Sequence, residues 1–335
     1  MAKTKTIILA AFLLTITSTL QAQDRGPMLT NEDFERAMEE LSNWGRWGDE
    51  DELGQANLIT PEKRLQAVAL VTEGITVSMS ADVVQEDEVE SPDTSAVLNR
   101  EVLRVSPTGA SDRYQYSGSY HGTIHSHLDS LDCHIMYEGS GYNGVTWEEV
   151  EAADGCPRGS IYAHRNGIVT RGILFDATLL PGKDTGNGWV EPGTAITYED
   201  LETLEEIQGV TVEPGDIIFL HTGRWTRREA LGPWPTSEGV AGYHADVAYF
   251  LKERGVAMIG HDMWNDASPS GVGDIFLPLH SLALVSLGVS IFDNLDFTEL
   301  AATAKELGRY EFLFMASPLR IVKGMGSPLN PLAMF

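Results

Sequence analysis

Residues 121 to 134, HGTIHSHLDSLDCH, constrain the chain more than any other segment, because they gather metal-binding side chains within a short distance. The segment holds four of the nine histidines in the chain. The polar and aromatic run that leads into it, YQYSGSYHG, is typical of a strand that approaches a loop. Side chains alternate along a strand, so His125, His127 and Asp129 are predicted to project from one face. Two imidazoles and a carboxylate are a suitable ligand set for a divalent ion such as zinc or manganese.

The composition is that of an ordinary globular protein with an acidic surface. The chain has 335 residues, of which 42% are hydrophobic, and a formal net charge of −26. A surface this negative repels phosphate backbones and anionic lipids, so nucleic acid and membranes are poor candidate partners and a small-molecule substrate is favoured. No linker, charge block or internal repeat marks a boundary, which predicts a single domain over residues 23–335.

The N-terminus, MAKTKTIILAAFLLTITSTLQAQD, has the layout of a secretory signal peptide. Lys3 and Lys5 precede an apolar run from Ile7 to about Ile16, and Ala22 is a small residue at a plausible cleavage point. The run is too short to span a bilayer, and no other segment is long and apolar enough to do so. We therefore expect residues 1–22 to be removed and the mature protein to be exported, either periplasmic or secreted.

Helical and strand patterns alternate along the rest of the chain. Helices are predicted from Thr30 to about Leu41, from Thr60 onward, from Thr197 to Gly209 and from Tyr243 to Gly255. β-rich runs lie at 75–83, 168–177, 215–223, 255–262, 289–294 and 310–321. The chain is thus predicted to be a mixed α/β protein, and periodicity leaves open whether its sheet is open or barrel-like.

Two cysteines, Cys133 and Cys156, have two roles open to them. Export to an oxidising compartment would allow them to form a disulfide. However, Cys133 lies inside the histidine cluster, where its thiol would also be placed to bind a metal. The spacing of the two cysteines does not fit a structural zinc site.

Four elements follow one another around the cluster: His121-Gly122, Ser126-His127-Leu128-Asp129-Ser130-Leu131, His134 and Tyr142-Asn143-Gly144. This order resembles the signature of the longer members of the metal-dependent cyclase family, which includes bacterial kynurenine formamidases and isatin hydrolases. The resemblance extends from WGRWGD at residues 44–49 to SPLRIVKGMGSPLNP near the C-terminus, and so covers nearly the whole mature chain.

The resemblance implies a swivelling β/β/α-type fold, in which helices flank a mixed sheet, and a homodimer or homotetramer with one or two divalent ions per chain. The ligands that it implies in the first motif are His121, His127 and Asp129, and Asp129 is able to bridge two ions. The later segment LPLHSLALVSLGVSIFDNLDFTEL supplies His280 and Asp293. The alternatives are a helix-capping role for His280 and a turn position for Asp293.

Two departures from the family pattern leave alternatives open. His134 matches the family's acid/base histidine but lies one residue later than the family spacing, as though Asp132 were inserted, and Cys133 stands in the expected place. The sequence that follows aligns better with His134 as the catalytic residue. The first ligand also lies in a longer loop than in compact members, so the resemblance implies His121 whereas strand alternation nominates His125.

Other residues outside the cluster are candidates for supporting roles. Trp44 and Trp47 match an early tryptophan region of the family and are predicted to wall the substrate pocket, although tryptophans are as often core residues. Asp262 ends a predicted strand together with His261 and is predicted to support the ligands from behind. The remaining histidines are assigned structural or surface positions: His164, His221 and His244.

The ligand set and the resemblance together predict a metal-dependent hydrolase for the carbon–nitrogen bond of an amide, formamide or lactam. A divalent ion acidifies water and polarises a carbonyl group, and His134 would carry the proton to the leaving nitrogen. The alternatives are an esterase or lactonase of the same family, a cupin-like metal oxygenase or lyase, and a non-catalytic metal-binding protein of the cell envelope. Export favours an environmental aromatic amide, lactam or lactone as the substrate.

Overall fold

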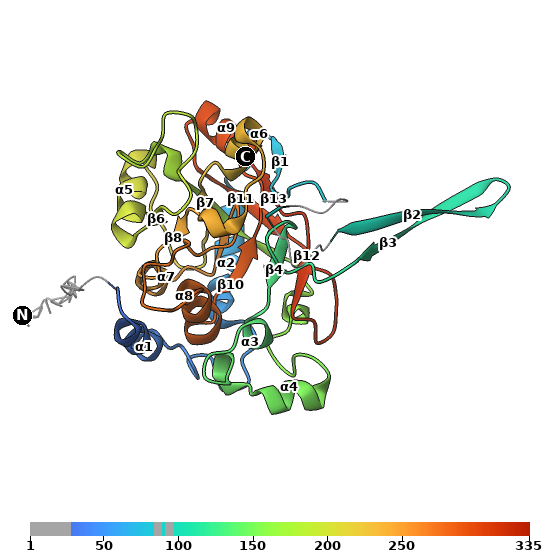
Figure 1. Ribbon diagram of the computed structural model, residues 1–335, viewed down its shortest axis with the longest axis horizontal. Helices are drawn as coiled ribbons and strands as arrows, with labels where there is room; N and C mark the ends of the chain where they lie inside the picture. Colours follow the sequence, from blue (N-terminus) through green and yellow to red (C-terminus); the bar gives the residue numbers. More distant parts are fainter. Residues whose placement is uncertain (1–27, 84–88, 91–96) are drawn as a thin grey trace, which may run out of the picture.

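The computed structural model describes residues 28–83, 89–90 and 97–335, so the predicted signal peptide lies outside the described residues. A nine-stranded mixed sheet forms the centre of the molecule, in the order β1-β13-β11-β5-β7-β9-β10-β4-β12 (Figure 1). Strands β5, β7, β9 and β10 run parallel to one another, and the pairings on either side of them are antiparallel. The nine strands are β1 Thr76–Ser78, β4 His127–Asp129, β5 Ile168–Asp176, β7 Ile217–His221, β9 Met258–His261, β10 Ser290–Asp293, β11 Glu311–Ala316, β12 Gly326–Pro328 and β13 Leu332–Met334.

Two small sheets and a set of helices surround the central sheet. A hairpin consists of β2 Leu98–Ser106 and β3 Gly109–Tyr116, and β6 Ala195–Ile196 pairs with β8 Gly242–Tyr243. The α-helices are α1 Asn31–Glu40, α2 Pro61–Val68, α3 Leu131–His134, α4 Trp147–Ala153, α5 Tyr198–Gln208, α6 Arg224–Leu231, α7 Val247–Arg254, α8 Pro278–His280 and α9 Thr298–Leu307. The 3₁₀ helices are η1 Gly54–Leu58, η2 Tyr142–Gly144, η3 Ile161–His164, η4 Ala177–Leu179 and η5 Thr236–Glu238, and the π-helix η6 Ser281–Leu287 continues α8. Among the described residues, no helix combines the length and apolar character that a bilayer span requires.

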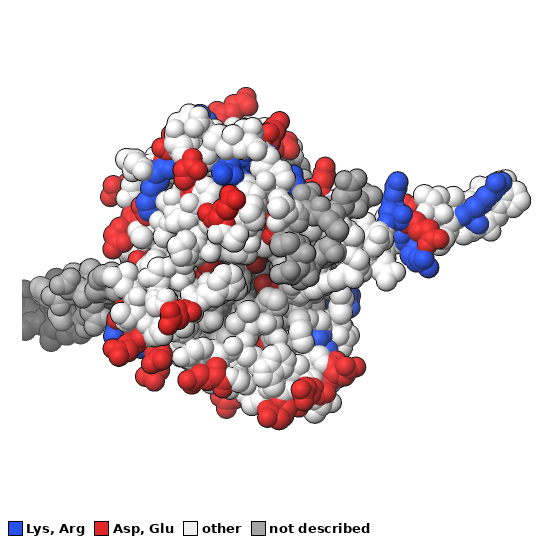
Figure 2. All heavy atoms as spheres, viewed as in Figure 1, with Lys and Arg blue, Asp and Glu red and all other residues white. Residues whose placement is uncertain are grey.

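The acidic character of the chain is visible on its surface and in its interior. Figure 2 shows acidic side chains over much of the visible face of the body. Inside, the Arg171 guanidinium binds both carboxylate oxygens of Asp216, at 2.9 and 2.6 Å, and Lys63 Nζ lies 2.5 Å from the same carboxylate. This buried carboxylate is therefore neutralised by two cations from different elements, as a charge in the interior requires.

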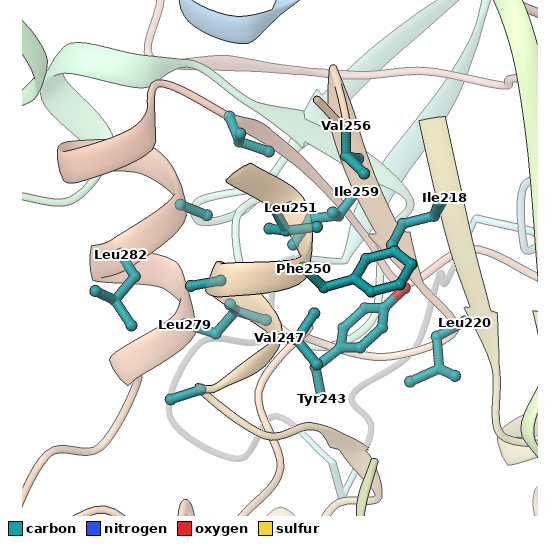
Figure 3. Close-up of a cluster of buried hydrophobic side chains, with 14 of the residues drawn as sticks. Ile218, Leu220, Tyr243, Val247, Phe250, Leu251, Val256, Ile259, Leu279 and Leu282 are labelled. Atoms are coloured by element: carbon teal, nitrogen blue, oxygen red, sulfur yellow. The ribbon is translucent and has the colours of Figure 1, made fainter. Parts of the chain in front are cut away.

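Both faces of the central sheet are buried against helices or other strands. On one face, Ile218 and Leu220 of β7 and Ile259 of β9 contact α7 and the α8–η6 segment (Figure 3). The opposite face packs against α9 and contains an aromatic group made of Phe219, Phe292, Phe297, Phe312 and Phe314. Strands that are buried on both faces have nearly continuous apolar sequences, which explains the predicted runs at 215–223 and 255–262.

The helix starts that the sequence predicts at Thr30, Thr60 and Thr197 are confirmed. Each threonine side chain accepts a hydrogen bond from the backbone N–H three residues later, and α1 and α5 have complete capping boxes. Gly209 ends α5 in the left-handed conformation, with φ of 65°. Local signals therefore determine these helix boundaries.

The prediction of a helix from Tyr243 was wrong at its N-terminal end. Tyr243 belongs to β8, and its backbone N–H donates to the carbonyl of Asn265 at 2.8 Å. Helix α7 begins four residues later, at Val247. Residues 243–246 are therefore held by backbone pairing with distant segments. The apolar periodicity of residues 243–255 could not reveal that pairing.

Each of the six β-rich runs contains a strand, but several strands are shorter than predicted. Only Thr76–Ser78 of the run at 75–83 is a strand, and β11 covers Glu311–Ala316 of the run at 310–321. The strand that precedes the histidine cluster ends at Tyr116, and the chain then forms a loop up to β4. The positions of His121 and His125 therefore depend on the path of this loop and not on strand alternation.

We predict that Thr197→Ala lowers the free energy of unfolding by about 1 kcal/mol, because it removes the side-chain acceptor for the N–H of Asp200. Thr203→Ala, in the same helix, is the matched control, since its hydroxyl only bonds back to the carbonyl of Glu199. Urea unfolding of both variants measures the difference. Equal losses in the two variants would contradict a capping role for Thr197.

Candidate metal centre

The pairing of β4 with β10 brings together two acidic segments that are far apart in the sequence. The strands run antiparallel, with His127 opposite Asp293 and Asp129 opposite Ile291. The imidazole Nε2 of His127 lies 3.5 Å from Asp129 Oδ1 and 3.9 Å from Asp293 Oδ2. The register of one strand pair thus places three candidate ligands, His127, Asp129 and Asp293, in one cluster.

Two overlapping groups of side chains in this cluster could each hold a metal ion. The first consists of His121, His127 and Asp129, and the second of Asp129, His280 and Asp293. Within each group the ligand atoms lie within 4.8 Å of one another. Asp129 belongs to both groups, so its two carboxylate oxygens could bridge two ions. The sequence-predicted ligands other than His125 and Cys133 therefore meet at one place.

Hydrogen bonds behind the ligands fix their orientation. The carbonyl oxygen of His125 lies 2.7 Å from His127 Nδ1, and Asp266 Oδ2 lies 2.5 Å from His280 Nδ1. In each histidine, a neutral ring that carries its proton on Nδ1 donates it to this acceptor. The Nε2 atom of that neutral ring can then bind an ion. Asn265 Nδ2 in turn donates to Asp293 Oδ1 at 2.6 Å.

The electrostatics of the cluster favour a cation. Asp129 is fully buried, and its Oδ2 accepts no hydrogen bond among the described residues. Burial alone would raise its pKa, but the adjacent imidazoles of His134, His127 and His121 hold that pKa well below its usual range. For His280 burial opposes protonation, yet the carboxylates of Asp266 and Asp293 keep its pKa well above its usual value. The carboxylates of the cluster thus hold a proton on His280, and a metal ion would neutralise the same carboxylates in place of that proton.

His134 lies at the edge of this cluster with its ring facing Asp129. Its Nε2 is 3.4 Å from Asp129 Oδ2, and its ring stacks on that of His121 with a centroid separation of 4.2 Å. Burial is the main cause that lowers the pKa of His134 to about 4, and the neighbouring histidines act in the same direction. His134 is therefore neutral near pH 7 and able to accept a proton. The side chains of His121 and His134 are 17% and 22% exposed, so the cluster opens to solvent on their side.

The prediction from strand alternation that His125 shares a face with His127 and Asp129 was wrong. Strand β4 begins only at His127, so the alternation does not reach residue 125. The ring of His125 lies against Tyr116, with centroids 5.0 Å apart, whereas His121 Nδ1 lies 2.7 Å from Asp129 Oδ1. A loop, rather than the strand, delivers the first histidine to the cluster.

The structure also places Cys133 away from the ligands. It forms a disulfide with Cys156, and both sulfurs belong to a small buried cluster with Val145 and Val150. Its thiol is therefore not available as a metal ligand, and His134, rather than Cys133, faces Asp129. The inserted residue Asp132 is buried beside this disulfide.

Three other predicted residues, Trp44, Trp47 and Asp262, have partners outside the two candidate ligand groups. Trp44 Nε1 donates to the carbonyl of Val285 at 2.7 Å, and the Trp47 ring stacks on the guanidinium of Arg46. Both tryptophans lie in the turn that precedes η1. Asp262 caps α6: its carboxylate accepts hydrogen bonds from three successive backbone N–H groups, those of residues 222 to 224.

Sequence reasoning missed Arg224 and Asn294. These two side chains connect the loop that carries His121 to the ends of β9 and β10. Arg224 is buried and donates to the carbonyl of Asp262, to Asn294 Oδ1 and to the carbonyl of Thr123. Asn294 Nδ2 donates to the carbonyl of Gly122 at 2.5 Å. These bonds fix the loop that carries the first histidine to the end of β10. The position of Asn294 directly after a predicted ligand was the one local signal for its role.

Comparison with known proteins identifies similarity to the cyclase family in both sequence and structure. A family model described as Putative cyclase matches residues 121–266, which include most of the cluster. A crystal structure described as that of a novel cyclase is 30% identical in sequence and has a TM-score of 0.74, with 88% of this chain and 100% of that chain covered. No curated protein matches the chain significantly.

Two isatin hydrolases share the fold at lower identity. Isatin hydrolase A from Labrenzia aggregata, bound to benzyl benzoate, has a TM-score of 0.56 at 19% identity, covering 80% of this chain and 94% of that chain. Isatin hydrolase A from Ralstonia solanacearum has a TM-score of 0.53 at 17% identity, covering 82% and 97%. The predicted fold, a mixed sheet with flanking helices, is confirmed by these matches.

The inserted Asp132 generates a prediction about stability. It is buried, neither carboxylate oxygen has a hydrogen bond among the described residues, and burial raises its pKa to about 8. The folded chain therefore retains a proton that the unfolded chain releases near pH 4, and stability falls as the pH rises from about 4 to 8. Asp132→Asn removes this loss, so we expect it to be about 3–5 kcal/mol more stable than the parent at pH 8 and close to it near pH 4.

Urea unfolding at the two pH values, under non-reducing conditions, measures this effect. Asp154→Asn is the matched control, because Asp154 is an exposed helix C-cap in the left-handed conformation, which asparagine also tolerates. The control should follow the parent at both pH values. A stability difference for Asp132→Asn that does not grow with pH would contradict the assignment of a buried, protonated carboxyl group.

Proposed function

The chain belongs to the cyclase family, and from that premise we propose that it is a metal-dependent hydrolase that cleaves the carbon–nitrogen bond of an amide, formamide or lactam. The observation that carries the proposal is the pair of ligand groups that share Asp129, with a neutral His134 beside them. A nucleophilic water, a polarised carbonyl and a proton carrier are the requirements of this hydrolysis, and one cluster offers a place for each.

The donor set fits a divalent ion such as zinc or manganese. Imidazole nitrogens and carboxylate oxygens are the ligands that both metals accept. Asp129 has a buried oxygen without a hydrogen bond among the described residues, which a cation would satisfy. With His121 and His127 on one side and His280 and Asp293 on the other, the chain offers ligands for one or two ions.

When bound, the ion would supply a Lewis acid and a water of lowered pKa. The Nε2 atom of His134 then takes a proton from the attacking water. The water oxygen bonds to the carbonyl carbon, the carbon–nitrogen bond breaks, and His134 returns the proton to the leaving nitrogen. The products are an amine and a carboxylic acid, which releases its proton to solvent near neutral pH, or a single amino acid product if the substrate is a lactam.

We further propose that the enzyme acts outside the cytoplasm. The N-terminal sequence has the layout of a signal peptide, and the disulfide between Cys133 and Cys156 is of a kind that persists in oxidising compartments. An exported hydrolase with this centre is suited to an aromatic amide or lactam from the environment. The N-terminal residue of protein recovered from the native host tests the export step, and an intact Met1 would contradict it.

We predict that Asp129→Asn and His134→Ala abolish activity in different ways. Asp129→Asn removes a charge that both ligand groups use, so metal content and turnover should be lost together. His134→Ala should retain metal while kcat falls by about 10²–10⁴-fold, because only proton transfer is removed. Metal analysis beside hydrolysis of isatin and N-formylkynurenine measures both effects.

His244→Ala serves as the control, since this histidine lies outside both ligand groups and bonds to the backbone of Asp246. It should retain both metal and turnover. Full activity of His134→Ala would refute its role as proton carrier. Turnover of an ester or lactone but of no amide, with the same dependence on Asp129, would assign the chain to the esterase branch instead.

We also predict that chelation removes activity reversibly. Dialysis against a chelator should abolish turnover, and return of zinc or manganese should restore it. Loss of the ion should also lower the melting temperature, because an ion bound to the folded state alone stabilises that state by mass action. Activity that survives complete metal removal would exclude the proposed chemistry, and bound metal without turnover of any amide, lactam or ester would favour a metal-binding protein.

A further inference from the structure

Helix α3 carries His134, but it has few interactions of its own to hold it in place. It spans Leu131–His134, which is about one turn, and Ser130 at its N-cap makes no side-chain capping hydrogen bond. One turn of helix is not stable by itself, because nucleation costs more conformational entropy than a single hydrogen bond recovers. The orientation of His134 therefore depends on contacts between α3 and other segments.

Backbone hydrogen bonds hold the start of the helix. The N–H and the hydroxyl of Ser130 both donate to the carbonyl of Met325, at 2.9 and 2.7 Å, and the N–H of Leu131 donates to the carbonyl of Gly159 at 3.2 Å. The carboxylate of Asp132 adds no polar anchor, since neither of its oxygens has a hydrogen bond among the described residues. The first residues of α3 are thus fixed, and the end next to the ligand cluster needs a separate tie.

The disulfide between Cys133 and Cys156 supplies that tie. Cys156 follows helix α4, and its backbone N–H donates to the carbonyl of Lys323 at 3.0 Å. Both cysteines are buried in one small cluster with Val145 and with Val150 of α4. Figure 1 shows α3 and α4 at the lower edge of the molecule. The disulfide thus joins α3 to a segment that lies outside both candidate ligand groups.

The direction of Cys133 determines the direction of His134. Successive side chains of an α-helix point about 100° apart, so fixing one side chain fixes the next. Cys133 is directed to Cys156 and away from the ligands. His134 accordingly faces the ligands, with its Nε2 atom 3.4 Å from Asp129 Oδ2 and its ring stacked on that of His121. The family spacing would place the histidine at position 133; in this chain the disulfide turns that position away and brings the following residue to the cluster.

We propose that the disulfide between Cys133 and Cys156 is a positioning element for His134, and that the chain reaches its full rate of proton transfer only in the oxidised form. The inference rests on the proposed function, in which His134 carries the proton. The two cysteines do not touch the reacting atoms and act through α3. An error of about 1 Å in the position of a catalytic group can lower a rate about a hundredfold, so a loosely held α3 would slow the reaction.

The positioning role relates activity to export. Formation of the disulfide removes one hydrogen atom from each thiol, and the two electrons and two protons pass to an oxidant such as another disulfide, which becomes two thiols. Thiols stay reduced in the cytoplasm and become oxidised in compartments outside it. A chain with the predicted signal peptide would therefore gain its full rate only after export.

The test compares the mature parent protein with Cys156→Ala, which breaks the disulfide without changing any residue of α3. Val150→Ala is the matched control, because it removes methyl groups from the same buried cluster and leaves the disulfide intact. We expect kcat of Cys156→Ala to fall at least about tenfold, while KM and metal content stay close to those of the parent. Val150→Ala should retain kcat, although both substitutions lower the melting temperature. All assays are run at a temperature at which every variant is folded.

Two further variants separate the effect on α3 from other effects. Cys133→Ala/Cys156→Ala should match Cys156→Ala, because the freed thiol of Cys133 plays no part. In a His134→Ala background, Cys156→Ala should cause no further loss of the residual turnover, since the disulfide acts only through His134. A further loss of the same size as in the parent would overturn the proposal, and so would an equal loss of kcat in Val150→Ala.

Amide hydrogen exchange gives a readout that needs neither metal nor turnover. The amides of residues 131–135 should exchange at least about tenfold faster in Cys156→Ala than in the parent, while those of the central sheet stay protected. Unchanged exchange at α3, or faster exchange without any loss of kcat, would overturn the proposal. A parent that hydrolyses no amide, lactam or ester would contradict the proposed function instead, and the exchange at α3 would still decide by itself whether the disulfide holds the helix.

Discussion

The antiparallel pairing of β4 with β10 is the interaction on which the candidate metal centre depends. It places His127 opposite Asp293 and directs Asp129 to the same side as both. A shift of the register by one residue would turn these side chains to the opposite face of the sheet. The parallel pairing of β10 with β9 and the packing on both sides of the sheet hold that register in place. The packing of the core therefore determines the relative positions of the candidate ligands.

Buried negative charge explains why the surroundings of the centre are so extensively hydrogen-bonded. Asp129, Asp266 and Asp293 are all buried within a short distance of one another, at a cost that unpaired charges could not sustain. Imidazoles, an asparagine and backbone N–H groups share the compensation. Arg224 and Asn294 extend this network to the loop of the first histidine. A divalent ion would neutralise the remaining charge of these carboxylates. The polar network of the fold is therefore suited to the metal that the proposed reaction needs.

Local features of the sequence predicted local features of the structure. The N-cap threonines and Gly209 marked helix ends correctly, because a cap is decided by residues within one turn. Strand alternation failed at His125, since the extent of β4 is determined by its pairing with β10 and β12 and not by its own composition. The resemblance to a family, rather than periodicity, nominated His121 and the distant pair His280 and Asp293. Asn265, Asp266 and Arg224 had no local pattern, because their roles exist only once distant segments meet.

The most direct test of this account is a crystal structure of the manganese-loaded protein with anomalous scattering data, which locates the metal without reference to activity. The account predicts anomalous density about 2.0–2.2 Å from Asp129 and from the histidines of at least one of its two ligand groups. The ring of His125 should lie outside the coordination sphere. Strong density at another site, or none in the cluster at saturating manganese, would contradict the claim that these residues form a metal centre.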